Sequence, residues 1–128
     1  MLAMAQELKP RAQSEGGAAS LRLAEFPRHY TEIAFRCASG VGEWHQHWAD
    51  TFFILEGSAR LVTGGELVDA REVGPGEKRG RAITGESRQQ LITGAVVHIP
   101  AGVAHQMILN EGEMITYFVV KIKETDEA

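Results

Sequence analysis

The sequence predicts an all-β domain, either an antiparallel sandwich or a small barrel. Short β-type runs alternate with turns along most of the chain, and no long amphipathic helix is evident. At 128 residues the chain fits a single domain. Hydrophobic residues make up 44% and charged residues 23%, which is typical of globular proteins and excludes intrinsic disorder for most of the chain.

Residues 1–20 are expected to form an N-terminal extension ahead of a domain that spans residues 21–124. Residues 2–9 could form a short helical turn, which Pro10 would interrupt. Residues 14–20 combine serine and glycine and are interpreted as a flexible linker. We expect no chemistry in this extension.

The predicted strands follow the extension. Residues 30–37 alternate, with Ile33 and Phe35 on one face and Glu32 and Arg36 on the other, as in a half-buried strand. Residues 114–122 show the clearest alternation between two faces. Phe118 lies on the apolar face, and Tyr117 and Lys121 lie on the other. Further strands are predicted over residues 51–55, 59–63, 96–99 and 103–109, with turns between them, including one at Glu56-Gly57.

Residues 64–93 have a different composition. They contain six glycines, five acidic and five basic residues, so their charges cancel. This composition predicts loops and hairpins rather than a core element.

Charge and cysteine content narrow the function classes. A net charge of −4 argues against a general binder of nucleic-acid backbones. Cys37 is the one cysteine, so it can form neither an internal disulfide nor a cysteine-based zinc site. No apolar run approaches 18 residues and no secretory leader is evident, so a cytoplasmic location without a membrane partner is expected.

Histidines suggest a metal site. His45 and His47 are two residues apart, and on a strand such side chains share a face. Asp50 can add a carboxylate, and His105 lies on another predicted strand among apolar positions, where it needs a partner. Three imidazoles and a carboxylate around one point would form a mononuclear metal site. The histidine pair alone is weak evidence, because such pairs also occur by chance on surfaces.

Two segments resemble the conserved motifs of the cupin superfamily. Residues 45–57 are similar to the first motif, G(X)5HXH(X)3-4E(X)6G. Residues 94–105 are similar to the second, G(X)5PXG(X)2H(X)3N, with Gly94, Pro100, Gly102 and His105 in register. The resemblance covers about residues 30–122 and implies an antiparallel double-stranded β-helix, a small jelly-roll barrel.

The sequence departs from this pattern at four places. Ser39 and Leu109 stand where the motifs have glycine and asparagine, and 36 residues separate Gly57 from Gly94, more than in compact cupins. Asp50 replaces the usual glutamate and follows His47 after two residues rather than three or four. Only this last change affects the site.

The resemblance implies that His45, His47 and His105 are metal ligands, together with Asp50. Asp50 would ligate directly, ligate through water, or orient a histidine. One divalent transition metal ion per chain is expected, and iron, manganese, nickel, copper and zinc would all accept this set. The alternative is a degenerate cupin with an empty barrel.

Several residues are assigned to the pocket or to the surface. Phe52, Ile54, Met107 and Phe118 are candidates for the apolar wall of the barrel. His98 is expected to point outward, with a pocket role as the alternative. Arg36 and Arg60 are expected on the outer face, although either could anchor an anion.

The leading functional hypothesis is a dioxygenase-type oxidoreductase acting on a small organic molecule in a dry, apolar pocket. A metal-dependent lyase, isomerase or cyclase is an alternative, and so is a protein that binds a metabolite or sugar without catalysis. A third alternative is a structural protein in which the metal or the barrel only stabilises the fold. No catalytic acid or base can be identified from the sequence. Pairing into a homodimer, as cupins frequently do, is expected.

Overall fold

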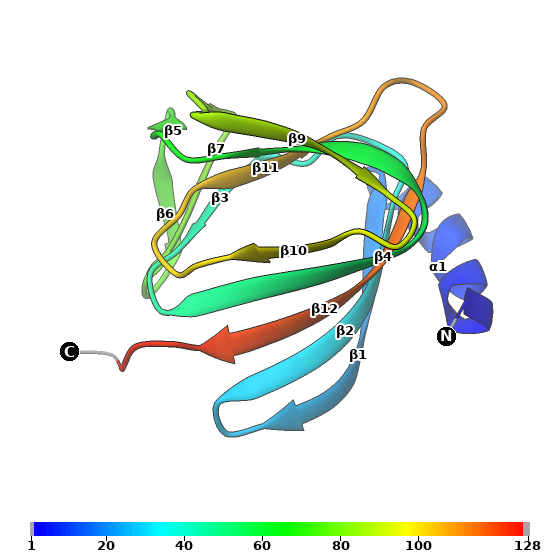
Figure 1. The fold of residues 1–128 in the computed structure, drawn as a ribbon, viewed down its shortest axis with the longest axis horizontal. Helices are drawn as coiled ribbons and strands as arrows, with labels where there is room; N and C mark the ends of the chain where they lie inside the picture. The colour runs from blue at the N-terminus through cyan, green and yellow to red at the C-terminus, as the bar shows by residue number, and fades with distance from the viewer. Residues whose placement is uncertain (1, 127–128) are drawn as a thin grey trace.

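The computed structural model describes residues 2–126, which form a curled antiparallel β-structure with a helix at its N-terminal end (Figure 1). The predicted all-β class is confirmed. The elements are α1 (Leu2–Ser14), β1 (Ala18–Phe26), β2 (His29–Arg36), β3 (Gly42–His45), β4 (Trp48–Thr63), β5 (Leu67–Val68), β6 (Arg71–Gly74), β7 (Glu77–Gly80), β8 (Ala82–Ile83), β9 (Ser87–Ile92), β10 (Val96–Ile99), β11 (His105–Ile108) and β12 (Ile115–Lys123).

Strand β4 connects the two layers of the barrel. Its first half pairs with β10 and β12, and its second half pairs with β9 and β11. The turn predicted at Glu56-Gly57 is instead a bend within this continuous strand. Gly57 has a φ of 88°, and a Cβ there would collide with the Met114 carbonyl oxygen. Glycine therefore permits both the bend and the close approach of the segment that leads into β12.

The strands form one layer of β1, β2, β12, β4 and β10, and a second layer of β9, β11, β3, β7 and β6 (Figure 1). Between the layers lies an apolar cluster that includes Leu61, Leu91, Ile99 and Ile115, all almost fully buried. This cluster closes one end of the barrel and leaves the other end available for polar side chains.

Helix α1 covers the outer face of the first layer. Its residues Ala5, Leu8 and Ala12 pack against Ile33 and Phe35 of β2. The helix continues past Pro10 to Ser14, contrary to the prediction, because this packing stabilises it beyond its intrinsic propensity. Residues 18–20, predicted as linker, begin β1 and pair with β2.

This packing reverses the predicted orientation of two strands. On β2, Ile33 and Phe35 face the helix, so Glu32 and Arg36 line the barrel interior. On β12, Tyr117 and Lys121 also face the interior, whereas Phe118 lies on the outer face and contacts Phe53. Alternation predicted the strands correctly, but both faces are covered, so polarity did not show which face is internal.

The segment 64–93 contains short strands and one core strand. The prediction of hairpins is confirmed for β6 and β7, which are joined through Pro75-Gly76. In contrast, β9 is a full partner of β4, and its Leu91 is completely buried. No helix within residues 2–126 has the length and apolar character needed to cross a membrane.

Candidate metal centre

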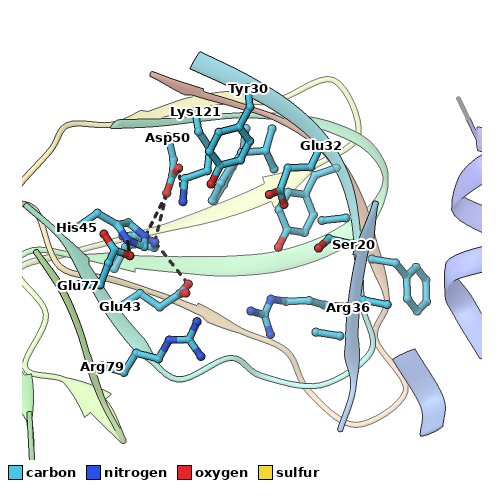
Figure 2. A pocket seen from close by; sticks show the side chains of 18 residues that line it. Ser20, Tyr30, Glu32, Arg36, Glu43, His45, Asp50, Glu77, Arg79 and Lys121 are labelled. Atoms are coloured by element: carbon cyan, nitrogen blue, oxygen red, sulfur yellow. Dashed lines mark hydrogen bonds and ion pairs between the residues drawn. The ribbon is translucent and has the colours of Figure 1, made fainter. Parts of the chain in front are cut away.

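Four side chains from three strands converge at one wall of the barrel (Figure 2). Asp50 Oδ2 lies 3.6 Å from Nε2 of both His45 and His105, and Glu43 Oε2 lies 3.6 Å from His105 Nε2. Ligand atoms about 2.1 Å from a shared metal lie about 3–3.5 Å apart. The observed spacing therefore fits a single ion, and Glu43, His45 and His105 could hold it.

Strand geometry explains this convergence. Glu43 and His45 are two residues apart on β3, so both side chains point to the same face. His105 begins β11 and pairs with Glu43 in the antiparallel register. Asp50 lies on β4 and is 3% exposed, as is His105. The pairing of β3, β4 and β11 places the four groups together.

The hydrogen-bond partners of the two imidazoles indicate their tautomers. His45 Nδ1 lies 2.5 Å from Glu77 Oε1, and His105 Nδ1 lies 3.4 Å from the Val103 carbonyl oxygen. Since both partners are acceptors, each Nδ1–H donates. In the neutral rings the Nε2 lone pairs then face the carboxylates of Asp50 and Glu43. Such facing lone pairs repel one another unless a cation lies between them, which is the arrangement that metal binding requires.

Burial favours a neutral His105, and neighbouring charges favour an ionised Glu43. Burial lowers the pKa of His105, against the opposing effect of Glu43 and Asp50. Burial acts to raise the pKa of Glu43, but the positive charge that His105 and His45 carry when protonated, with smaller effects of Arg36 and Lys121, outweighs it and lowers that pKa. A neutral imidazole and an ionised carboxylate are the forms that bind metal ions.

His47 does not join this cluster. The strand β3 ends at His45, and residues 46 and 47 form a bend before β4 begins. The alternation assumed for His45 and His47 is therefore broken, and His47 Nδ1 lies 2.7 Å from Thr125 Oγ1 instead. The residue that shares a face of β3 with His45 is Glu43, which lies two residues before it.

A pocket of about 380 Å³ opens beside the cluster. Phe52 lines it, as expected. Ile54 and Met107 are buried in the apolar cluster instead, and His98 is exposed, with Nδ1 2.9 Å from Thr51 Oγ1. Phe118 lies outside, as described above. The polar and charged lining residues are Ser20, Tyr30, Glu32, Arg36, Glu43, His45, Asp50, Glu77, Arg79, His105, Tyr117 and Lys121.

This lining differs from the dry, apolar pocket that the sequence suggested. The reason is the reversed orientation of β2 and β12, which places their charged faces inside. Lys121 Nζ lies 3.2 Å from Asp50 Oδ1, and the Tyr30 ring lies above it (Figure 2). Burial lowers the pKa of Lys121, but Asp50 and Tyr30 outweigh it and raise that pKa. Lys121 is therefore a cation beside the cluster.

Comparison with solved structures identifies the architecture. A cupin domain of Cnp3 from Schizosaccharomyces pombe matches with a TM-score of 0.60 at 14% identity, over 84% of this chain and 64% of that one. The DMSP lyase DddQ from Ruegeria pomeroyi matches with a TM-score of 0.63 at 16% identity, over 91% and 52%. A sugar phosphate isomerase of the cupin superfamily from Silicibacter pomeroyi matches with a TM-score of 0.58 at 18% identity, over 84% and 60%.

This chain has a cupin fold. The predicted fold is thereby confirmed, and the chain spans less than two thirds of each of these three chains. No family model and no curated protein matches the sequence.

The spacing of the first motif also accounts for Glu43, which the sequence analysis did not identify as a candidate ligand. Counting back from Gly57, the first motif places its acidic residue at Asp50. With four intervening residues, its second histidine falls on His45 and its first on Glu43. The motif is thus present as Glu-X-His-(X)4-Asp-(X)6-Gly, and the departure noted at His47 disappears. The number of residues before Asp50 therefore indicated Glu43 and His45. In the sequence analysis the motif is instead aligned on His45 and His47, because a histidine pair matches its usual form.

Other pocket residues gave no comparable sequence signal. Lys121 and Arg36 lie on strands whose sequence alternates equally well with either face inside. Glu77 lies in the segment predicted as loops, yet β7 pairs with β3 and places it opposite His45.

Proposed function

We propose that this cupin is a metal-dependent enzyme that catalyses a non-redox reaction, a lyase or isomerase step, on a small polar molecule. The observation that carries the proposal is the convergence of Glu43, His45, Asp50 and His105 on a pocket lined by charged side chains. These four residues would hold one divalent ion. When bound, such an ion supplies Lewis acidity, which polarises a carbonyl or carboxylate oxygen.

Residues next to the cluster supply the proton-transfer groups that such a reaction needs. Tyr30 and Lys121 lie side by side in the pocket, and Lys121 contacts Asp50. Burial raises the pKa of Tyr30. A protonated phenol and an ammonium group beside the ligand cluster can donate protons. Glu32, on the same face of β2 as Tyr30, can accept one.

The polar lining also favours this class over a dioxygenase. An apolar pocket excludes water around a reactive oxygen species, whereas this pocket carries charges on several sides. Among the structures with the same fold are a lyase and an isomerase, which supports the same choice. Their substrates are not carried over, because identities of 16% and 18% show the fold alone.

Elemental analysis tests the metal site first. Protein purified without an affinity tag or chelator should contain about one equivalent of a divalent transition metal, and His105→Ala should lose it. Lys121→Met should retain the metal, because Lys121 is not a ligand. Absence of metal from the wild type after anaerobic reconstitution would contradict the proposal.

Deuterium exchange tests the reaction class. The metal-loaded protein would be incubated in D₂O with a panel of small hydroxy acids and sugar phosphates and followed by NMR. We expect exchange or elimination at a carbon next to a carbonyl or carboxylate, lost in Lys121→Met. Oxygen uptake in step with substrate loss would support a dioxygenase instead, and stabilisation without turnover would support a binding protein.

A further inference from the structure

Arg36 is a cation that lines this pocket and is held by an uncharged partner, Tyr117. Its guanidinium points from β2 into the pocket, on the side away from Asp50 (Figure 2). Within residues 2–126, no carboxylate forms an ion pair with it, although Tyr117 shares a side-chain hydrogen bond with it. Lys121, in contrast, is paired with Asp50.

The surrounding structure holds Arg36 in this orientation. Tyr117 is buried on β12, and its hydroxyl accepts from the guanidinium. On another side, a Cβ at Gly40 would lie 2.9 Å from both Cζ and Nη1 of Arg36. Gly40 is itself held by hydrogen bonds, from its N–H to the Met107 carbonyl oxygen and from Gln106 Nε2 to its own carbonyl oxygen. The guanidinium is therefore packed in place rather than free to turn toward solvent.

Holding an arginine in this partly buried position costs free energy unless an anion pairs with it. Guanidinium stays charged at all ordinary pH values, and a partly buried charge needs a partner. Its planar array of N–H donors matches the geometry of a carboxylate or phosphate. Tyr117 uses one donor, so others remain available toward the pocket.

The charge balance of the pocket leads to the same conclusion. Its lining has four carboxylates, on Glu32, Glu43, Asp50 and Glu77, and three permanent cations, on Arg36, Arg79 and Lys121. With neutral imidazoles this gives −1. A divalent ion at the cluster would change it to +1, so the metal-loaded pocket would attract an anion.

We propose that Arg36 anchors the carboxylate or phosphate group of the ligand, so that the ligand is a small anion extending from Arg36 toward the metal cluster. The inference rests on the proposed function for the identity of the site. It adds the chemical class of the ligand and the residue that selects it. Arg79, exposed at the pocket edge on β7, is placed to add a second positive charge (Figure 2).

Calorimetric titration with two probes, succinate and inorganic phosphate, tests this inference on metal-loaded protein at constant ionic strength. We expect the wild type to bind at least one probe, and Arg36→Met to bind it about tenfold or more weakly. The matched control is Arg88→Met, because Arg88 is exposed on β9 and lies outside the pocket. Tighter binding of succinate would indicate a carboxylate ligand, and tighter binding of phosphate a phosphate ester.

Metal content, measured on every sample, separates this inference from the proposed function. Arg36-dependent anion binding in a chain that holds no metal would overturn the proposed function and retain the anchor. Binding within twofold of wild type in Arg36→Met, or no binding of either probe to the metal-loaded wild type, would overturn the anchor. If circular dichroism shows that Arg36→Met does not fold, Arg36→Lys and Gly40→Ala replace it. The first keeps the charge but loses the planar donors, and the second displaces the guanidinium, so both should weaken binding.

Discussion

Glu77 Oε1 lies 2.5 Å from Nδ1 of His45, across the antiparallel pair formed by β7 and β3. The carboxylate accepts a hydrogen bond from Nδ1–H, and Nε2 is left to face Asp50. A carboxylate behind a ligating histidine orients the ring and raises its basicity. Glu77 is therefore a positioning residue for the candidate metal centre, although it lies outside the motif.

Removal of this carboxylate should weaken metal binding without abolishing it. For Glu77→Ala we expect metal affinity to fall about 10- to 100-fold, measured by competition with a chromophoric chelator. Glu72→Ala is the control, since Glu72 is exposed on β6. Equal affinity in the Glu77 variant and the control would show that His45 needs no support from β7.

The two neighbouring histidines should respond differently to substitution. His45→Ala is expected to lose stoichiometric metal, because His45 Nε2 faces the cluster. His47→Ala should keep the metal but lose its hydrogen bond to Thr125 and the packing of a buried ring, at a cost of about 1–3 kcal/mol in the free energy of unfolding. Metal loss in His47→Ala with retention in His45→Ala would restore the interpretation of the histidine pair.

Gly57 should tolerate no side chain. In Gly57→Ala, a left-handed backbone and a clash with the Met114 carbonyl oxygen combine, so we expect a loss of about 2–4 kcal/mol in urea denaturation. Gly94 has a φ of 90°, but a Cβ added there would meet no atom within 4 Å, so Gly94→Ala should cost only about 1 kcal/mol. Similar losses in the two variants would mean that β12 can move away from β4.

Acid should destabilise the protein partly through Glu113. Its Oε1 accepts hydrogen bonds from Arg60 Nη2 at 2.6 Å and from the Asn110 N–H at 2.5 Å. These contacts lower the pKa of Glu113 from 4.5 to about 2. Because the folded pKa is depressed, this stabilisation is complete above about pH 4.5 and is lost as the pH falls toward 2.

Denaturation at pH 6 and pH 3 checks this expectation. Wild type should lose more stability between the two values than Glu113→Gln, whose side chain does not titrate. Glu111→Gln, at an exposed position in the same loop, should behave as the wild type does. Parallel pH profiles for all three proteins would rule out a contribution from Glu113.

Helix α1 should contribute to the stability of the barrel. Leu8 is 3% exposed and packs against β2, so Leu8→Ala is expected to cost about 2–4 kcal/mol in the free energy of unfolding. Met4 on the same helix is 39% exposed, and Met4→Ala should change stability by less than about 0.5 kcal/mol. If Leu8→Ala were equally mild, the helix would be dispensable for folding.

Local patterns predicted the strands well but not their environment. The alternation of apolar and polar residues placed β2 and β12 close to their observed bounds, because this periodicity depends only on consecutive residues. It gave the wrong inner face for both strands, since the apolar side of β2 packs under α1 and its charged side borders the pocket. Two covered faces with opposite polarity cannot be distinguished by period alone.

The sequence by itself determined the all-β class, the second motif with His105, and the acidic position at Asp50, because each depends on residues close together in the chain. Only the tertiary structure decided that Glu43 replaces His47, since the bend at residues 46 and 47 ends the alternation on which the pair relied. It also decided that Glu77, Lys121 and Arg36 border the site, because they come from strands that meet only when the sheet curls. Contacts between distant segments depend on how every layer packs, and no short stretch of sequence contains that information.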